Sequence, residues 1–313
     1  MGNYASWMTT TALSATVADF GTDVMDNFFD KNSVMKAIKK YGGLEEKNTG
    51  DEFTAPVIKE GGNVQWFTRT TKVSDNMPDP VQTTEWNMRF CQVPVKVYWT
   101  DEVKNRQSKG KIFDYVQTLK DVQKKTYENE METAFWRATP VANSINSLQT
   151  LIDATETVGG LNPTTYTWWV SQTKSTTSFA STGITDMQNF LITLDAEGAK
   201  IDVIFMGTTE YGYFLKAVDD RSILQNGAND VGFGIGKVPF NGIPVEISNK
   251  LTSGEAYYID FSTIKLRVNK GATTMTPWVD MENEMARKSH YLYCQELYTN
   301  NRRANGVHTI SGA

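Results

Sequence analysis

Trp168 and Trp169 stand side by side near the middle of the chain, and Asp153 and Glu156 precede them in the same segment, LIDATETVGGLNPTTYTWW. Exposed aromatic rings stack on sugar rings, and two carboxylates can cleave a glycosidic bond when they flank it at a suitable separation. These four residues therefore define one candidate chemistry, that of a carbohydrate-active enzyme. Tryptophans also supply large contact areas in cores and interfaces, and surface loops commonly carry carboxylates. We therefore favour a packing and anchoring role for the two tryptophans.

A second candidate is the glycine-rich segment GFGIGKV at residues 232–238, which superficially resembles a phosphate-binding loop. Such a loop needs the spacing GxxxxGK followed by Ser or Thr, between a strand and a helix, so that backbone N–H groups face the phosphate. Here Val238 and Pro239 follow Lys237, and strand-like residues come next. The segment therefore predicts a flexible loop and no nucleotide cofactor.

Metal and nucleophile chemistry is limited by the scarcity of cysteine and histidine. The residues of these types are Cys91, Cys294, His290 and His308, and the cysteines lack CxxC spacing. We expect both cysteines to be small packing residues, with no metal site and no Ser-His-Asp or Cys-His device. Carboxylate chemistry stays open, but the chain is expected not to be an enzyme.

The composition of the 313 residues is that of a globular protein, with 40% hydrophobic, 12% aromatic and 21% charged residues. The formal net charge of −5 argues against attachment to nucleic acid or anionic lipid by bulk charge, although a local basic patch stays open. Apolar runs are too short for a membrane span. The start, MGNYASWMTTTALSATV, lacks the basic and apolar regions of a secretory signal, so an intracellular protein is expected.

The elements that must position these residues begin with a helix over residues 11–40. Its apolar positions recur at spacings of three and four, and YGG at Tyr41 ends it. Two alternatives stay open: the apolar stripe packs on its own domain, or it belongs to an arm that is buried on a neighbouring subunit. The stripe consists of Leu13, Val17, Phe20, Val24, Phe28, Val34 and Ile38.

Residues 53–99 are rich in β-branched and aromatic residues and predict a long hairpin. The segments NVQWFTRTTKV and TTEWNMRFCQVPVKVYW are expected to form two long strands, with SDNMPDP (74–80) as the turn at the tip. An isolated two-stranded hairpin is marginal in water. The hairpin carries too few apolar residues to pack on both faces, and it therefore needs a partner.

The returning strand changes its apolar phase. Trp86, Met88 and Phe90 hold even positions, whereas the later apolar residues hold odd ones. A slip of one residue moves the apolar set to the opposite face, so a bulge or bend is expected near Cys91 and Gln92, where the projecting hairpin rejoins the body. The later residues are Val93, Val95, Val97 and Trp99.

A long amphipathic helix is expected over residues 111–138, ended by Thr139-Pro140. At ~1.5 Å per residue it would run roughly 40 Å, which suits a structural spine. Its stripe consists of Ile112, Val116, Leu119, Tyr127, Met131, Ala134 and Ala138.

The next part of the chain predicts a compact α/β subdomain. A capping box at Thr185–Gln188 opens a helix that Gly198 ends, IDVIFM follows as a buried strand, and TTEYGYFLKAVDD forms a second helix. IPVEIS, AYYIDFSTIKLRV and RKSHYLYCQELYT are strand-like, and RRANGVHTI is expected to hold an Asn-Gly turn between short extended pieces.

The order of these segments is similar to that of a known protein family. The segments are the hairpin that returns through VPVKVYW, the long helix, the LQTLIDATETVGGLNPTTYTWW connector, IFMGTTEYGYFLKAVDDR, VPFNGIPVEIS and NRRANGVHTI. The chain resembles the major capsid proteins of tailed bacteriophages with the Hong Kong-type fold, from about residue 40 onward. The resemblance implies an α+β fold in four parts: an N-terminal arm (1–52), an extended β-hairpin loop (53–92), a peripheral domain with the spine helix (93–146 and 255–313) and an axial domain (147–254).

The resemblance also implies a structural function, the self-assembly of pentamers and hexamers into an icosahedral shell around double-stranded DNA. Arg302 and Arg303 are interpreted as solvated turn residues or as donors of ion pairs between subunits. The residues expected at the self-assembly interface are Trp66, Phe67, Met77, Trp86, Met88, Phe90, Arg302 and Arg303.

The expected partners are further copies of the chain, a portal, a decoration protein in some particles, and packaged DNA held by non-specific contact, with no membrane. About 50 residues precede the hairpin, too few for a long scaffolding segment, so a separate scaffolding protein is expected. The location would be the virion, after assembly in the host cytoplasm. The alternatives are an encapsulin-type bacterial compartment, which shares the fold, and a monomeric carbohydrate-active enzyme.

Overall fold

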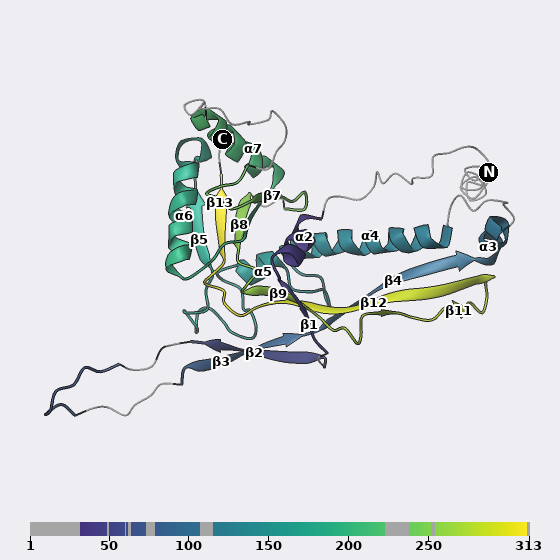
Figure 1. The fold of residues 1–313 in the computed structure, drawn as a ribbon, viewed down its shortest axis with the longest axis horizontal. Helices are drawn as coiled ribbons and strands as arrows, with labels where there is room; N and C mark the ends of the chain where they lie inside the picture. The colour runs from purple at the N-terminus through teal and green to yellow at the C-terminus, as the bar shows by residue number, and fades with distance from the viewer. Residues whose placement is uncertain are drawn as a thin grey trace.

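The computed structural model describes residues 32–48, 50–59, 61, 64–72, 79–106, 115–222, 238–251 and 254–311. These residues form an elongated body with a hairpin projecting from one end (Figure 1). Most of the helix expected over residues 11–40, the tip turn with Met77, and the glycine-rich segment up to residue 237 lie outside the described residues.

One strand, β12 (Ala286–Thr299), runs along the body and organises the first sheet. It pairs antiparallel with β4 (Arg89–Tyr98) over its first ten residues and with β9 (Ile264–Val268) over its last five. The remaining members of this six-stranded sheet are β1 (Leu44–Glu46), β10 (Thr274–Met275) and β11 (Val279–Asp280).

A second sheet of five strands forms the subdomain at the upper left of Figure 1, with helices α6 (Ile184–Ala196) and α7 (Thr208–Ser222) beside it. The expected buried strand and both expected helices are confirmed. In spatial order the strands are β5 (Gln172–Thr176), β13 (Gly306–Ile310), β8 (Glu255–Ile259), β6 (Val203–Met206) and β7 (Val245–Ile247).

The capping box expected at Thr185–Gln188 does not form. Helix α6 continues from a π-helical turn at Phe179–Gly183, so no side chain caps it at Gly183. Asp186 instead accepts hydrogen bonds from the hydroxyls of Thr176 and Thr182, which ties the first turn of α6 to β5. At the other end Gly198 adopts φ +79° and ends the helix as expected.

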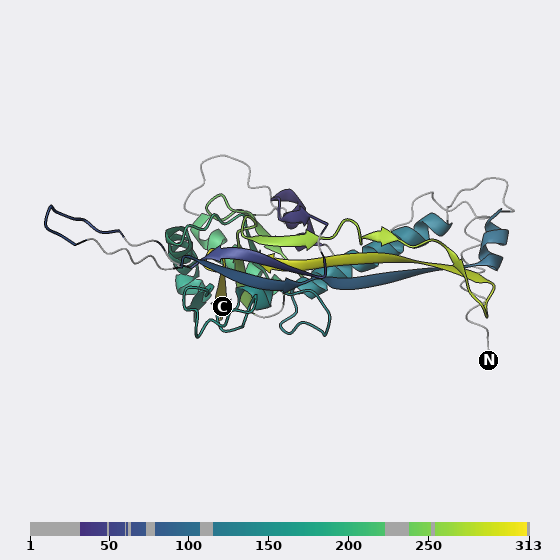
Figure 2. The ribbon, with the colours of Figure 1, turned by 90° about the horizontal axis from the view of Figure 1, so that it is seen from below.

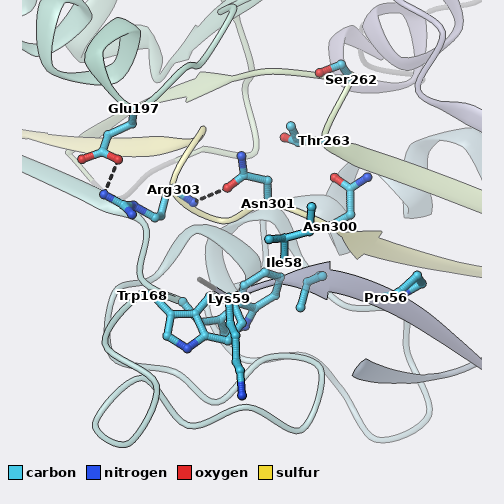
Figure 3. A pocket seen from close by; sticks show the side chains of 12 residues that line it. Pro56, Ile58, Lys59, Trp168, Glu197, Ser262, Thr263, Asn300, Asn301 and Arg303 are labelled. Carbon is cyan, nitrogen blue, oxygen red and sulfur yellow. Dashed lines mark hydrogen bonds and ion pairs between the residues drawn. The ribbon is translucent and has the colours of Figure 1, made fainter. Parts of the chain in front are cut away.

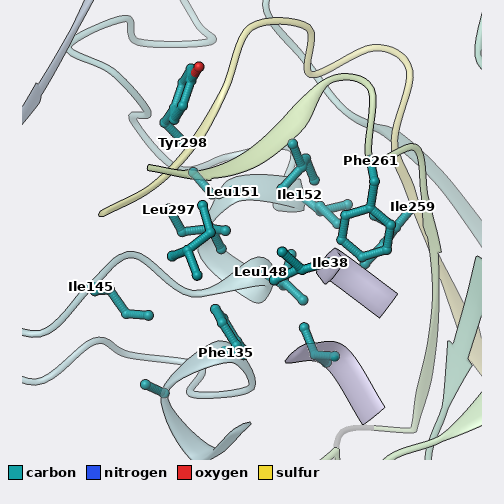
Figure 4. Close-up of a cluster of buried hydrophobic side chains, with 14 of the residues drawn as sticks. Ile38, Phe135, Ile145, Leu148, Leu151, Ile152, Ile259, Phe261, Leu297 and Tyr298 are labelled. Carbon is teal, nitrogen blue, oxygen red and sulfur yellow. The ribbon is translucent and has the colours of Figure 1, made fainter. Parts of the chain in front are cut away.

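The two faces of the second sheet contribute to two different cores, because side chains alternate along a strand. Val203 and Phe205 of β6 face the large cluster of the elongated body, whereas Ile204 and Met206 face α6 and α7. Figure 4 shows the larger cluster, in which residues from many segments meet. It includes Ile38, Phe135, Ile145, Leu148, Leu151, Ile152, Ile259, Phe261, Leu297 and Tyr298.

The spine helix, α4 (Tyr115–Phe135), lies along the first sheet (Figures 1 and 2). Its Tyr127 ring stacks on Tyr293 of β12 with centroids 3.7 Å apart, and the Tyr127 hydroxyl donates to Gln295 at 2.6 Å. The described helix has 21 residues, so it runs roughly 32 Å rather than 40 Å. Ala138, expected on its apolar stripe, lies exposed beyond its end.

Helix α2 (Ser33–Lys40) packs on its own subunit, which supports one of the two alternatives for this part of the chain. The buried Glu132 carboxylate of α4 accepts hydrogen bonds from the Ser33 hydroxyl and the Val34 N–H at the start of α2, and also from the Ser248 hydroxyl. A carboxylate at a helix N-terminus accepts hydrogen bonds from free N–H groups and interacts favourably with the positive end of the helix dipole.

The projecting hairpin starts from a different strand than the sequence predicted. Strand β2 (Glu52–Ile58) pairs with β3 (Val81–Asn87), and the described residues 64–72 form no strand. The bulge expected at Cys91 and Gln92 is also absent, because β4 pairs with β12 without interruption. The apolar phase changes at Met88, which separates β3 from β4.

Two further boundaries differ from expectation. Strands β8 and β13 belong to the second sheet, although residues 255–259 and 306–310 were expected in the peripheral domain. Strand β4 ends at Tyr98, and Trp99 begins helix α3 (Trp99–Arg106). Helix α5 (Leu148–Ile152) follows the spine helix and enters the large core.

We expect Phe205→Ala to lower the free energy of unfolding of the unassembled subunit by about 3–5 kcal/mol, because Phe205 is fully buried where the second sheet meets Trp136 of the elongated body. Urea unfolding followed by tryptophan fluorescence measures this. The control Ile192→Ala removes a side chain that is 68% exposed and should change stability by less than about 0.5 kcal/mol. Equal losses in both variants would contradict this account of the core.

Candidate functional site: the projecting hairpin and the junction that anchors it

The root of the hairpin is held by one buried face. Phe53, Ala55 and Val57 of β2 and Thr84 and Trp86 of β3 are buried, while the alternate residues of both strands are mostly exposed. The Trp86 indole N–H donates to the Thr84 hydroxyl at 2.8 Å, and that hydroxyl donates to the Ala55 carbonyl at 3.0 Å. The root is therefore built as part of the subunit core.

Gly159 lets the connector reach this root. It has φ +60°, and a Cβ there would lie 2.8 Å from Thr84 Cβ. The carbonyl of Gly159 accepts from the Glu85 N–H at 3.1 Å, so the connector pairs locally with the outer edge of β3. A glycine satisfies both the left-handed backbone and the close approach.

Beyond Ile58 the hairpin leaves the body and carries exposed aromatic residues. Trp66 is 95% exposed and Phe67 is 70% exposed. Figure 1 shows this dark-blue part of the chain at the left end, away from both sheets. Contiguous exposed apolar groups of this kind mark an interaction surface.

The chain crosses between the two sheets three times, and the two short crossings are bound to each other. We call them together the junction, which comprises residues 260–263 between β8 and β9 and residues 300–305 between β12 and β13. Asn305 accepts from the Asp260 N–H at 2.9 Å and donates to the Thr263 hydroxyl at 2.8 Å. The expected Asn-Gly turn is wrong, since the chain turns at Arg302–Asn305 and Asn305 is a buried linking residue.

Arg302 binds the connector to the junction. Its guanidinium is fully buried and donates to the main-chain carbonyls of Leu151, Asp153, Glu156 and Trp169. Burial lowers the pKa of Arg302 to about 10, opposed by the charges of Asp153 and Glu156, so the side chain stays protonated at neutral pH. Four carbonyls in a fixed arrangement suit the planar fork of arginine.

The tryptophan pair is part of this anchorage. Trp169 is 2% exposed and donates from its indole N–H to the Val158 carbonyl at 3.1 Å. The Asp153 carboxylate accepts from Thr155 and Glu156 within its own loop. The buried Trp169 ring and the Asp153 carboxylate, which is bound within its own loop, do not support the carbohydrate-active alternative.

A hollow of about 540 Å³ lies between the hairpin root and the junction (Figure 3). Trp168 and Lys59 line one side of it, and Asn301 and Arg303 line another. Arg303 forms an ion pair with Glu197 at the end of α6.

Glu296 is a buried carboxylate beside the place where the hairpin joins β4. It accepts from the Asn146 N–H at 2.8 Å and from the Leu297 N–H at 3.0 Å, and Arg89 Nε lies 3.5 Å away. Burial raises the pKa of Glu296 to about 7, against the lowering effects of the two N–H donors and of Arg89.

The structure divides the residues that were expected at the self-assembly interface. Trp66, Phe67 and Phe90 are exposed, and their place at the interface stays a prediction. Three of the expected residues have side chains that are at most 3% exposed in the chain's own interior, which argues against a direct interface contact for them. These are Trp86, Met88 and Arg302.

Sequence reasoning did not identify Asn305 or Glu296, and only weak signals for them existed. Glu296 sits in an otherwise apolar and aromatic strand, where a carboxylate needs hydrogen-bond donors. Within the described ranges, no group of three or more His, Cys, Asp or Glu side chains could hold a metal ion, and no helix is long and apolar enough to cross a membrane.

Solved structures share this arrangement over nearly the whole chain. The capsid of cyanophage A-1(L) matches with a TM-score of 0.70 and 15% identity, over 96% of this chain and 99% of that one. This is the Hong Kong-type capsid fold. The expected fold class is thereby confirmed, including the spine helix and the extended loop.

Two other structures with this capsid fold are similar. The capsid of the native GTA particle has a TM-score of 0.62 and 12% identity, over 95% of this chain and 98% of that one. The SrpI encapsulin complex from Synechococcus elongatus PCC 7942 has a TM-score of 0.58 and 10% identity, over 95% of this chain and 94% of that one. No family model and no curated protein sequence matches the chain.

Arg302→Ala should destabilise the unassembled subunit by on the order of 3 kcal/mol or more, because it leaves four carbonyls without their donor. The neighbouring Arg303 supplies a matched control, because its side chain is half-exposed and forms an ion pair with Glu197. Arg303→Ala should lower the free energy of unfolding by no more than about 1 kcal/mol. Urea unfolding of both variants tests this, and similar losses would contradict the anchoring role.

The raised pKa of Glu296 predicts a pH dependence of stability. The pKa of about 7 in the folded state lies above the ordinary glutamate pKa of 4.5, so the native state binds more protons between these values. The stabilising contribution is complete below about pH 4.5 and is lost as the pH rises through 7. Glu296→Gln should remove this part of the decline, as measured by urea unfolding at a series of pH values. Glu85→Gln, at an exposed position, serves as control, and unchanged slopes in Glu296→Gln would contradict the prediction.

Proposed function

We propose that this chain is the shell-forming subunit of a tailed-phage capsid. Copies assemble into pentamers and hexamers, and these close an icosahedral shell around double-stranded DNA. The observation that carries the proposal is a capsid fold over 96% of the chain combined with an arm whose Trp66 is 95% exposed in its own subunit. The role is structural, not catalytic.

The physical reason is that the buried side chains of the described part of the hairpin lie at its root. Beyond Ile58 the described residues 64–72 have neither strand pairing nor burial, and such an arm gains stability when a neighbour covers it. Repetition of one contact around a symmetry axis closes a ring and makes weak contacts collectively strong.

The parts of the chain have proposed places in the shell. The extended loop (53–92) lies across a neighbouring subunit, and the second sheet with α6 and α7 gathers around the five-fold and six-fold axes as the axial domain. The remaining sheet and spine helix form the peripheral domain, and residues 1–52 form the N-terminal arm. A separate scaffolding protein, a portal and non-specific contact with the packaged DNA complete the assembly, which belongs in the virion.

An encapsulin-type compartment is the second candidate, favoured by the likeness to the SrpI encapsulin with a TM-score of 0.58. The two functions differ in contents. Particles isolated from infected or induced cells should contain double-stranded DNA if the chain is a phage capsid protein. A particle that carries enzyme cargo and no DNA would favour the compartment.

Shortening the hairpin should abolish shells without unfolding the subunit. The Lys59 N–H donates to the Pro80 carbonyl at 2.9 Å, so an Asn-Gly turn replacing residues 60–79 can close β2 onto β3. We expect soluble subunits or capsomers with an unchanged circular dichroism spectrum and no shells in negative-stain images. The full chain, purified in parallel, is the control. Shells of normal size from the shortened chain would refute the assembly role of the hairpin.

A further inference from the structure

One buried carboxylate joins three separate parts of the chain. The Glu132 side chain, in the last turn of the spine helix α4, is 1% exposed. Its Oε1 atom accepts a hydrogen bond from the Ser33 hydroxyl at 2.9 Å and another from the Ser248 hydroxyl at 3.0 Å. Its Oε2 atom accepts from the Val34 N–H at 3.1 Å. Ser33 and Val34 open helix α2, whereas Ser248 directly follows β7 of the second sheet.

The second sheet reaches Glu132 by a further route through Trp136. The Trp136 indole N–H donates to Glu132 Oε1 at 3.4 Å, and the ring packs edge-on against Phe205 of β6 with centroids 5.4 Å apart. Ser248 is fully buried, and its N–H donates to the Met206 carbonyl at the end of β6 at 3.1 Å. Glu132 therefore lies where α2, the spine helix and the second sheet meet, at the end of α4 beside α2 in Figure 1.

Helix α2 keeps this site dry. Val34 and Ile38, from the apolar side of α2, are at most 1% exposed. A buried carboxylate needs several hydrogen-bond donors, and donors at the start of a helix are favoured by the helix dipole. Two of the four donors to Glu132 come from α2. Because water is excluded, the loss of any donor leaves an unmet acceptor in a site of low dielectric constant.

We propose that Glu132 and its donors form a lock, through which the seating of α2 controls how firmly the second sheet is held on the spine helix. While α2 is seated, the carboxylate depends on the Ser248 hydroxyl. When α2 leaves, water solvates the carboxylate and replaces that hydroxyl, so the second sheet loses this contact with α4. Residues 1–31 precede α2 in the sequence, so a force on them acts on the subunit through the lock. The inference concerns a single subunit and goes beyond the proposed function.

The coupling is reciprocal. If the seating of α2 strengthens the Ser248 contact, then the Ser248 contact must hold α2 in place by the same factor. Loss of the Ser248 hydroxyl should therefore increase the opening of α2, although Ser248 belongs to another part of the chain. A carboxylate that only contributed to the general stability of the core would show no such preference for α2.

Hydrogen exchange of the unassembled subunit measures the local opening of α2 and so tests the lock. Ser248→Ala should raise the opening constant of the α2 amides (33–40) by about fivefold or more, because the hydroxyl matters most while α2 is seated. The matched control is Ile204→Val, which weakens the same sheet at a fully buried position on the face that packs on α6 and α7. It should leave this constant within about twofold of wild type. Equal increases in both variants would overturn the lock.

A third variant shows whether the effect passes through the carboxylate. In a Glu132→Met background the acceptor is gone, so adding Ser248→Ala should change the opening of α2 by no more than about twofold. An undiminished effect of Ser248→Ala in this background would overturn the inference. If Glu132→Met does not fold, the comparison of Ser248→Ala with Ile204→Val decides by itself. None of these measurements involves shells, so the proposed function stands whatever their result.

Discussion

The constraint on which this structure depends is that the two short crossings between the two sheets, at residues 260–263 and 300–305, must be held in register. Asn305 joins the crossings, with its side chain bonded to the Asp260 N–H and the Thr263 hydroxyl. Arg302 adds the connector by donating to four main-chain carbonyls. Buried polar groups of this kind need complete pairing to be stable, so the sheets, the connector and the hairpin root share one arrangement.

This anchorage explains how a subunit can carry a long unsupported arm. The root of the hairpin is fixed by Thr84 and Trp86 against Gly159 of the connector, and Trp169 buries the connector itself. Past Ile58 the described residues 64–72 are exposed. In the proposed assembly, a fixed root would orient the arm before a neighbouring copy covers it, which would reduce the conformational entropy lost on assembly.

Long periodic segments were predictable from the sequence, because their burial pattern is local. The spine helix, the buried strand at Val203–Met206 and helix α7 lie where the spacing of apolar residues placed them. The order of such segments also pointed to the capsid fold. Strand pairing was less predictable: the segment with Trp66 and Phe67 is rich in strand-forming residues, yet the hairpin is paired through Glu52–Ile58.

The sequence by itself therefore determined the elements, their order, and the presence of a hairpin too polar to form its own core. The tertiary structure alone decided which of the residues expected at the surface are buried. The sequence predicts a surface position for Arg302 beside Arg303, but Arg302 lies in the interior. Trp86 and Met88 likewise belong to the core of the chain. The physical reason is that burial of a charged or aromatic side chain depends on donors and surfaces from distant segments. Apolar periodicity records only which face of an element is covered, and it does not say by what.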